Sequence, residues 1–368
     1  MIPLFDIKPK KSEIKQYLNL YKKNLLKADF IQGQQVKELE KALSDYTGIK
    51  YVQTCANGTD ALVISLKSLN LKKNSYVITT PFSWISTAHA IINSGLRPLF
   101  VDVKINDFNL NIEEIKKAYE KYKKKVSCVL SVDLFGAPND NDKIYNFCKL
   151  KKIKFLIDGA QSFGSTINRK SSFKFCDIAT TSFFPTKPLG CYGDGGAIFT
   201  KNKILKNKIR SLCFNGIDTD KSKFKTIGLN SRLDTIQASV LLKKLKNLDK
   251  KLNFLRKIFF YYNKNLSEHF MFQKMKSNYK SSHALLSIIS KKMNRKEAMN
   301  VFKKNKIETK IYYPVLMSKQ KSIKKNSKIY GKLKNANYLS NNIFSISFNK
   351  KINLKIIRKI KNYFNAHI

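Results

Sequence analysis

Lys187 stands between two prolines in the stretch SFFPTKPLGCYGDGGA, residues 182–197. Pro185 and Pro188 restrict the backbone on both sides of this lysine and remove two N–H donors. Glycines at positions 190, 193, 195 and 196 then permit tight turns close to a ligand. An exposed lysine needs none of these constraints, so we expect Lys187 to be held out of solvent. A desolvated lysine has a lowered pKa and can condense with a carbonyl compound.

A carboxylate follows an apolar run in KFLIDGAQSFG, residues 154–164. Asp158 stands where a strand is expected to end, and ligands bind at the carboxyl ends of strands in open α/β sheets. A carboxylate at such a position is costly to leave without a partner. A helix N-cap or a purely structural acid is an equally good interpretation of this residue alone.

A strand, a turn and a helix are also indicated by TCANGTDAL, residues 54–62. Asn57 and Gly58 form the expected turn, and Thr59 opens the helix. Free backbone N–H groups and a hydroxyl at a helix start can cradle a phosphate, although an ordinary capped helix has the same pattern. The chain lacks both the dinucleotide fingerprint G-x-G-x-x-G and the P-loop motif, so a phosphate site would need this other explanation.

Taken together, these residues meet the needs of pyridoxal 5′-phosphate (PLP). The aldehyde of PLP needs a lysine, its ring nitrogen needs a carboxylate, and its phosphate needs fixed donors. Trp84, the single tryptophan, follows another expected strand and is placed to stack on the ring. The combination is more specific than any of its parts.

Apolar runs alternate with amphipathic stretches, which is typical of an α/β protein with a mostly parallel sheet. This alternation predicts a large domain, residues 1–245, with a seven-stranded sheet. Past residue 245 the pattern changes to lysine-rich helices and weaker strands, which predicts a smaller C-terminal α/β domain, residues 246–368. The seven expected strands of the large sheet are 50–55, 75–80, 97–103, 127–135, 153–158, 177–184 and 196–200.

The net charge of +46 raises the alternative of a basic nucleic-acid-binding protein. Most of the 71 basic residues are lysines spread along the whole chain, however, whereas base readout favours arginine. We therefore expect no nucleic-acid partner. No apolar run is long enough for a membrane span and no signal peptide is apparent, so we expect a cytoplasmic protein without membrane insertion. The six cysteines show no zinc-site spacing, and we expect no metal.

Several motifs occur in the chain in the same order as in the DegT-type sugar aminotransferases, and the chain resembles this family. Its members are PLP enzymes of the aspartate-aminotransferase fold, fold type I. The resemblance is carried by FIQGQQVKELEKALSDYTGIKY, CANGTDAL, PFSWISTAHAI, LIDGAQSFG, SFFPTKPLGCYGDGGAIFT and NSRLDTIQA, and it covers nearly the whole chain. It implies a homodimer with shared active sites.

The resemblance implies a role for each matching residue. Lys187 would bind PLP covalently and move protons, and Asp158 would pair with the ring nitrogen. The remaining cofactor contacts would be Gln161 near the phenolic oxygen, Gly58, Thr59 and Ser182 on the phosphate, Trp84 against the ring, and Asn230 on the phosphate of the partner's site.

Within the family the chain looks most like the UDP-2-acetamido-2-deoxy-ribo-hexuluronate aminotransferases. This implies L-glutamate as amino donor and a UDP-linked 3-keto-hexuronic acid as acceptor, for a surface glycan such as an O-antigen. Arg232 is the candidate carboxylate clamp, with a structural arginine at the dimer interface as the alternative. Tyr312 and Tyr313 are candidates for substrate contacts.

Three positions depart from the family pattern, namely Asn215, Tyr312 and Asp133, and because such positions tend to border the sugar they leave the substrate open. A 4-keto or another 3-keto 6-deoxyhexose nucleotide, linked to dTDP, UDP or GDP, is the alternative acceptor. A sugar dehydratase would carry histidine at position 187, and the lysine present there disfavours it.

Overall fold

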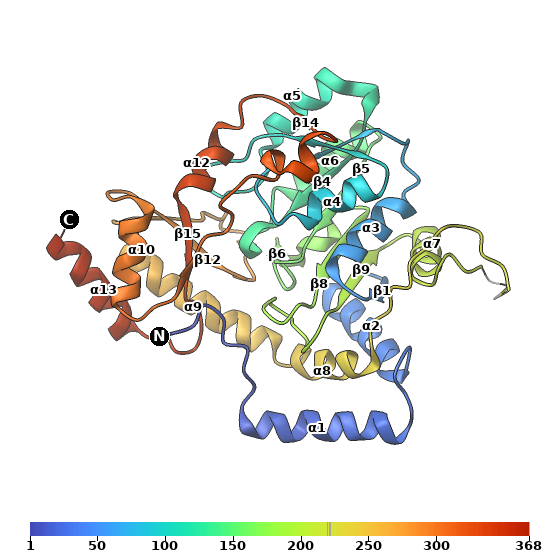
Figure 1. Ribbon diagram of the computed structural model, residues 1–368, viewed down its shortest axis with the longest axis horizontal. Coiled ribbons are helices and arrows are strands. Elements are labelled where there is room, and N and C mark those ends of the chain that lie inside the picture. Colours follow the sequence, from blue (N-terminus) through green and yellow to red (C-terminus); the bar gives the residue numbers. More distant parts are fainter. Residues whose placement is uncertain (219, 221, 368) are drawn as a thin grey trace.

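The computed structural model describes residues 1–218, 220 and 222–367. Its largest sheet has eight strands in the order β1-β9-β8-β5-β4-β2-β3-β14, and only β9 runs against the others (Figure 1). All seven expected strands are present, and β14 is an additional edge strand that pairs with β3. The strands are β1 (Tyr51–Cys55), β2 (Tyr76–Thr79), β3 (Arg97–Phe100), β4 (Val126–Val132), β5 (Lys154–Asp158), β8 (Ile178–Ser182), β9 (Gly196–Thr200) and β14 (Lys328–Ile329).

Helices cover both faces of this sheet. Successive residues of a strand point to opposite faces, so each buried strand contributes to an apolar cluster on either side. On β5, Phe155 and Ile157 join one apolar cluster while Leu156 joins the other. The first cluster contains residues of α2 (Gln34–Thr47), α5 (Ile112–Tyr122), α6 (Asn141–Leu150) and α8 (Thr235–Leu245). The second contains residues of α3 (Gly58–Ser68), α4 (Ser86–Asn93) and α7 (Lys203–Cys213). The sheet is thus buried on both faces, as a parallel sheet requires.

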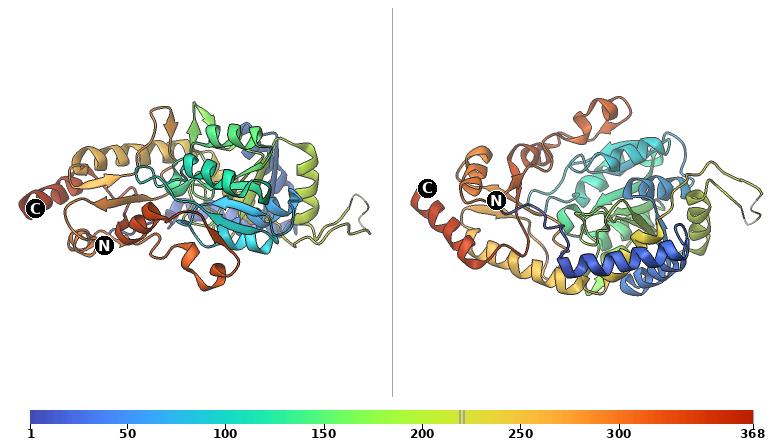
Figure 2. Two further views of the ribbon diagram at one scale, coloured as in Figure 1. Left: turned by 90° about the horizontal axis from the view of Figure 1, so that it is seen from above. Right: turned by 60° about the horizontal axis from the view of Figure 1, so that its bottom comes forward.

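A second, antiparallel sheet forms the core of the C-terminal part, in the order β10-β12-β15-β13. Its strands are β10 (Phe270–Phe272), β12 (Leu286–Ser290), β13 (Thr309–Lys310) and β15 (Ile343–Ile346), and it packs with α10 (Arg295–Lys304) and α13 (Leu354–His367). The long helix α9 (Leu248–Leu266) runs from α8 to this sheet (Figures 1 and 2).

Shorter elements complete the chain. A small three-stranded sheet joins β6 (Thr166–Ile167), β7 (Lys170–Ser171) and β11 (Tyr279–Lys280). The remaining α-helices are α1 (Lys11–Leu26), α11 (Lys321–Lys324) and α12 (Lys334–Asn342), and the short 3₁₀ turns are η1 (Lys123–Lys125), η2 (Leu134–Gly136), η3 (Ser172–Lys174) and η4 (Met317–Lys319). No helix within the described ranges is both long and apolar enough to cross a bilayer.

The chain crosses between its two parts more than once. The amide of Leu4 donates to the Glu308 carboxylate over 2.7 Å, and the amide of Met317 donates to the carbonyl of Pro81 over 2.8 Å. The N-terminus therefore lies on the C-terminal part, while β14 and Met317 lie on the large sheet. The division of the chain between residues 245 and 246 stays a prediction. The contacts above show that the N-terminal residues pack on the C-terminal part and that β14 pairs with the large sheet.

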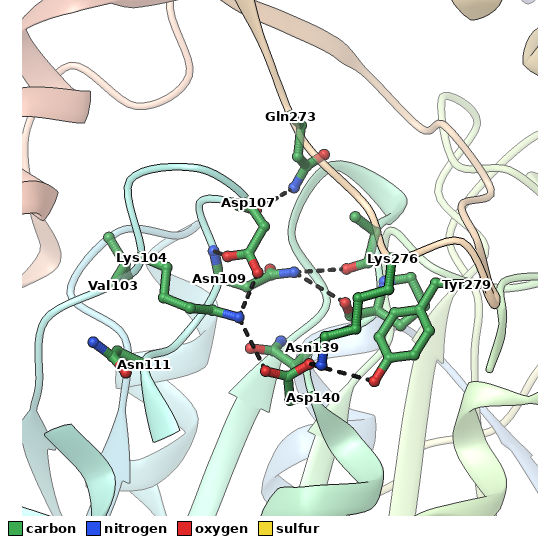
Figure 3. A network of polar contacts seen from close by, with 12 residues as sticks. Val103, Lys104, Asp107, Asn109, Asn111, Asn139, Asp140, Gln273, Lys276 and Tyr279 are labelled. Carbon is green, nitrogen blue, oxygen red and sulfur yellow. Dashed lines mark hydrogen bonds and ion pairs between the residues drawn. The ribbon is translucent and has the colours of Figure 1, made fainter. Parts of the chain in front are cut away.

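An ionic network ties the segment after β10 to the large sheet (Figure 3). Lys276 from this segment and Lys104 from the loop after β3 both form ion pairs with Asp140. The Tyr279 hydroxyl also reaches Asp140, at 3.3 Å, and the Gln273 amide donates to the carbonyl of Asp107 over 2.7 Å. Two lysines and a hydroxyl thus converge on one carboxylate that is mostly buried.

Candidate active site

A cavity of about 700 Å³ lies at the carboxyl edge of the large sheet. It is lined by residues at or after the ends of β1, β2, β5 and β8. Parts of the chain from far away in the sequence also line it, including Phe5, Ala284 and Leu285. The sequence predicted eleven site residues, and nine of them line this cavity: Gly58, Thr59, Trp84, Asp158, Gln161, Ser182, Lys187, Tyr312 and Tyr313.

Lys187 lies in a tightly held turn after β8. Its amide donates to the carbonyl of Phe184 over 2.9 Å. A Cβ atom on Gly190 would lie 2.5 Å from the carbonyl oxygen of Pro185, so the turn requires glycine there. From the helix side, the Nζ atoms of Lys244 and Lys251 donate to the carbonyls of Gly190 and Pro188, each over 2.7 Å. The proline and glycine context therefore does fix the backbone around Lys187.

The electrostatic setting of Lys187 is that expected of a reactive amine. Burial lowers the pKa of Lys187, and the carboxylate of Asp158 partly opposes this shift. At a given pH, the amine of Lys187 is therefore neutral and nucleophilic in a larger fraction of the molecules than a solvated lysine would be.

Asp158 ends β5 and is only 5% exposed. Its Oδ2 accepts a hydrogen bond from the Thr87 hydroxyl over 2.8 Å, and its Oδ1 accepts one from the Ala160 amide over 3.2 Å. Burial raises the pKa of Asp158, while these two hydrogen bonds and the charge of Lys187 act to lower it. The carboxylate is therefore buried but held by donors on both oxygens.

The turn between β1 and α3 is an open helix start. The Asn57 side chain accepts from the Asp60 amide over 2.8 Å. The amides of Gly58 and Thr59 come before the amide of Ala61, which makes the first helical hydrogen bond, to the carbonyl of Asn57. A Cβ on Gly58 would lie 2.7 Å from the Cβ of Ser182, so glycine lets the helix start approach the end of β8. Two backbone donors and two hydroxyl groups therefore gather at this end of the cavity.

Another part of the cavity wall is formed by Gln161, Tyr313 and Trp84. The Gln161 Oε1 atom accepts from the Phe135 amide over 2.6 Å, and its Nε2 atom donates to the Tyr313 hydroxyl over 3.0 Å. The Trp84 ring is 58% exposed and lies 6.2 Å from the Tyr313 ring, centroid to centroid. One N–H of Gln161 is left for a ligand.

Two predicted residues, Asn230 and Arg232, do not line this cavity. Asn230 is exposed and Arg232 is half-buried. Between them, the Ser231 hydroxyl accepts from the Ala56 amide over 3.1 Å, which attaches this segment to the end of β1. Their roles stay predictions.

The expectation that Asp133 borders a bound sugar is not supported by its surroundings. Asp133 is fully buried and accepts hydrogen bonds from Asn139, Asn141 and Ser162. Each of its oxygens is used within the protein, so the residue holds the loop after β4.

The sequence analysis missed two hydroxyl groups of the site, Ser86 and Thr87. Both line the cavity from the first turn of α4. The signal was available, because two hydroxyl residues follow Trp84 and Ile85 where a helix begins after a strand. Phe5 and Leu285 had no such signal, since only the tertiary fold brings them to the cavity.

PLP fits the residues that are present. The cavity contains one partly desolvated amine, one carboxylate held on both oxygens, and one glycine-dependent helix start with free amides. Lys187 would hold the aldehyde carbon, Asp158 the ring nitrogen, and the Gly58–Thr59 turn with Ser182 the phosphate.

Comparisons with known proteins agree with this chemistry. The model of the DegT/DnrJ/EryC1/StrS aminotransferase family matches residues 11–364. The UDP-2-acetamido-2-deoxy-3-oxo-D-glucuronate aminotransferase of Pseudomonas aeruginosa is 34% identical over 325 residues, which is 88% of this chain and 89% of that protein.

Two further proteins broaden the comparison. The 3-oxo-glucose-6-phosphate:glutamate aminotransferase of Bacillus subtilis is 29% identical, over 84% of this chain and 70% of that protein. The crystal structure of a DegT DnrJ EryC1 StrS aminotransferase from Brucella abortus superposes with a TM-score of 0.94 at 31% identity, and it covers 100% of this chain and 99% of that chain.

Proposed function

Because the chain belongs to the DegT/DnrJ/EryC1/StrS aminotransferase family, we propose that it transfers the amino group of L-glutamate to a keto group on a nucleotide-linked sugar. It is a PLP-dependent aminotransferase. The sugar we propose is a UDP-linked 3-keto-hexuronic acid, and the product would enter a surface glycan.

The sugar assignment is supported by what the relatives act on. The Pseudomonas aeruginosa relative is named for a UDP-linked 3-oxo-glucuronate, and the Bacillus subtilis relative is named for a 3-oxo sugar phosphate with glutamate. A 3-keto group and an added carboxylate are therefore the features that we propose for the acceptor. Arg232 is the candidate for its carboxylate, because a guanidinium group binds carboxylates with two parallel hydrogen bonds.

The observation that carries the proposal is that Lys187 and Asp158 line one cavity and that the charge of Asp158 acts on Lys187. When bound, PLP supplies an aldehyde that takes up amino groups and a ring that accepts electrons. The Nζ atom of Lys187 would take a proton from the amino donor and return it to the product as a general base and acid. Asp158 would keep the ring nitrogen protonated, and Tyr313 would exclude water behind Gln161.

We also propose a homodimer whose active sites are shared. Asn230 is exposed and does not line the cavity of its own chain, in accord with a role in the partner's site. The α1 helix presents Ile14, Leu18, Tyr21 and Leu25 on one face, each at least 39% exposed. Such a stripe of apolar side chains is typical of a surface that is covered by another protein.

A panel of nucleotide ketosugars with L-glutamate tests the reaction. The PLP-loaded protein is incubated with each ketosugar in turn, and the amino products are identified by mass spectrometry. The panel contains a UDP-linked 3-keto-hexuronic acid and the 4-keto and 3-keto 6-deoxyhexoses linked to dTDP, UDP or GDP. We expect amination of the UDP-linked uronic acid above all others. Lys187→Ala serves as the inactive variant and Lys246→Ala, at an exposed lysine, as the matched control. Preference for a 6-deoxyhexose would contradict the proposed sugar substrate. Absence of an amino product from every ketosugar of the panel would contradict the proposed reaction.

Subunit mixing tests the shared site. Lys187→Ala and Asn230→Ala subunits are unfolded together, refolded and assayed. If Asn230 acts in the partner's site, a mixed dimer has one site with both residues intact, and about a quarter of wild-type activity returns by random pairing. If Asn230 acts within its own chain, every site lacks one residue and no activity returns.

A further inference from the structure

The first turn of α4 brings two hydroxyl groups to the cavity, and each binds a different site residue. The Thr87 hydroxyl donates to Asp158 Oδ2 over 2.8 Å, and the adjacent Ser86 hydroxyl accepts from Thr59 over 3.0 Å. One helical turn therefore contacts both the residue proposed for the ring nitrogen and a residue proposed for the phosphate. Thr87 is 1% exposed, so solvent does not compete for its hydrogen bond.

Thr87 and Ala160 each donate a hydrogen bond to a different oxygen of the Asp158 carboxylate. Thr87 binds Oδ2 and the Ala160 amide binds Oδ1, at 2.8 and 3.2 Å. The Ala160 donor is a backbone amide two residues after Asp158, so it belongs to the same turn and does not fix the carboxylate relative to another element. Thr87 comes from a different element, 71 residues away, so of these two donors it is the one that fixes the carboxylate relative to α4.

We propose that Thr87 is a positioning residue whose hydroxyl group holds Asp158 in the orientation and the ionised state that a protonated pyridine nitrogen requires. The proposal rests on the proposed function, since it takes Asp158 as the partner of that nitrogen.

The electrostatic surroundings give this hydrogen bond a measurable effect. Burial raises the pKa of Asp158, and the Thr87 hydroxyl is first among the groups that lower it again. Removing the hydroxyl therefore raises the pKa of Asp158 and favours the uncharged acid, which cannot form an ion pair.

Other charged or titratable groups near Asp158 are present in every variant and do not explain a difference between variants. Lys187 lowers the pKa of Asp158, whose own charge acts on Tyr313. Further groups are Asp133 directly after β4, and Asp60, Asp194 and Tyr312 in the cavity lining. His89 lies on α4 and contacts Ser322.

The test measures PLP binding to the apoprotein as a function of pH. Trp84 is the only tryptophan and lines the cavity, so quenching of its fluorescence reports PLP binding without turnover. We expect affinity to weaken toward acid pH as Asp158 is protonated. Thr87→Val, which keeps the shape and removes the hydroxyl, is expected to move the midpoint upward by about one pH unit, since a hydrogen bond to a charged group has about that worth.

Two variants separate positioning from packing. Thr87→Ser keeps the hydroxyl and is expected to restore the wild-type midpoint. Thr79→Val makes the same substitution at a buried threonine of β2 whose hydroxyl has no hydrogen-bond partner among the described residues, so its midpoint is expected to stay at the wild-type value. Thr87→Ala replaces Thr87→Val if the valine variant does not fold, and the same upward displacement is expected of it.

The outcomes are distinct from those of the proposed function. An unchanged midpoint in Thr87→Val, a displaced midpoint in Thr87→Ser, or a wild-type affinity that does not change with pH overturns the proposal for Thr87 and leaves PLP binding intact. Absence of any quenching and of a visible absorption band in the wild-type protein overturns the proposed function, and the role of Thr87 with it.

Discussion

The side chain of Gln161 donates a hydrogen bond to the hydroxyl of Tyr313 over 3.0 Å. Gln161 follows β5 of the large sheet, whereas Tyr313 lies between β13 and η4. The carbonyl of Tyr313 in turn accepts from the Ser340 hydroxyl of α12 over 3.2 Å. One tyrosine thus connects the wall of the cavity to an element near the end of the chain.

Tyr313→Phe is expected to destabilise the protein by roughly 1–3 kcal/mol, because it leaves the buried Nε2 atom of Gln161 without its acceptor. Gln161 is 6% exposed, so water does not readily replace the lost partner. Denaturant unfolding measures the change. Tyr312→Phe is the matched control, since that ring is only partly buried, and an equal loss in the two variants would contradict the importance of the Gln161 contact.

The reactivity of Lys187 should depend on pH in a defined direction. Burial lowers the pKa of Lys187, so the neutral amine forms below the ordinary lysine pKa of about 10.4. We expect the rate of PLP capture by the apoprotein, followed by stopped-flow absorbance, to rise with pH through a midpoint below that value.

Asp158→Asn should move this midpoint further down, because it removes the negative charge that favours the ammonium form of Lys187. The exposed carboxylate of Asp45 supplies the control, and Asp45→Asn should leave the midpoint in place. A midpoint that rises in Asp158→Asn would show that the two groups do not interact as described.

Gly58→Ala is expected to weaken PLP binding at least about tenfold while the protein stays folded. The new methyl group would stand 2.7 Å from the Cβ of Ser182 and push the start of α3 away from the end of β8. Even a displacement of about 1 Å is costly where several donors must meet one ligand. Titration with PLP measures the affinity, and an alanine variant that binds PLP normally would rule out a phosphate site in this turn.

Asp140→Asn is expected to lower the free energy of unfolding by roughly 1.5–3 kcal/mol at neutral pH, as it removes charge from a carboxylate that pairs with Lys104 and Lys276. Burial alone would raise the pKa of Asp140, but the two lysines hold it below its usual value. The stabilisation is therefore present above the unfolded pKa of about 3.9 and is lost as the pH falls through the lower folded value. Asp45→Asn, in an exposed pair with Lys41, is expected to change stability by less than about 1 kcal/mol. Equal effects of the two substitutions would argue against the network.

The large sheet could be predicted from the sequence because its strands are short apolar runs between helical patterns. β14 could not, since Lys328 and Ile329 are both exposed and pair with β3 through backbone hydrogen bonds. Two exposed residues leave no alternation of apolar and polar residues to recognise.

Residues of the site could be predicted where the local sequence carries the constraint. Lys187 was marked by its prolines and Gly58 by its turn, and both constraints are present in the structure. The contact of Thr87 with Asp158 joins residues 71 positions apart, and a threonine at a helix start is common enough to pass unnoticed. The roles proposed for Asn230 and Arg232 would depend on a second chain and on a substrate, which local sequence does not describe.

The contribution of Tyr313 to the cavity has a consequence for biosynthesis. A ribosome releases Asp158 and Lys187 well before it releases Tyr313, and Ser340, which binds the Tyr313 carbonyl, comes later still. A nascent chain can therefore form the β5 and β8 ends of the site without the wall that closes it. Stable capture of the cofactor should therefore await synthesis of the segment that contains Tyr313 and Ser340.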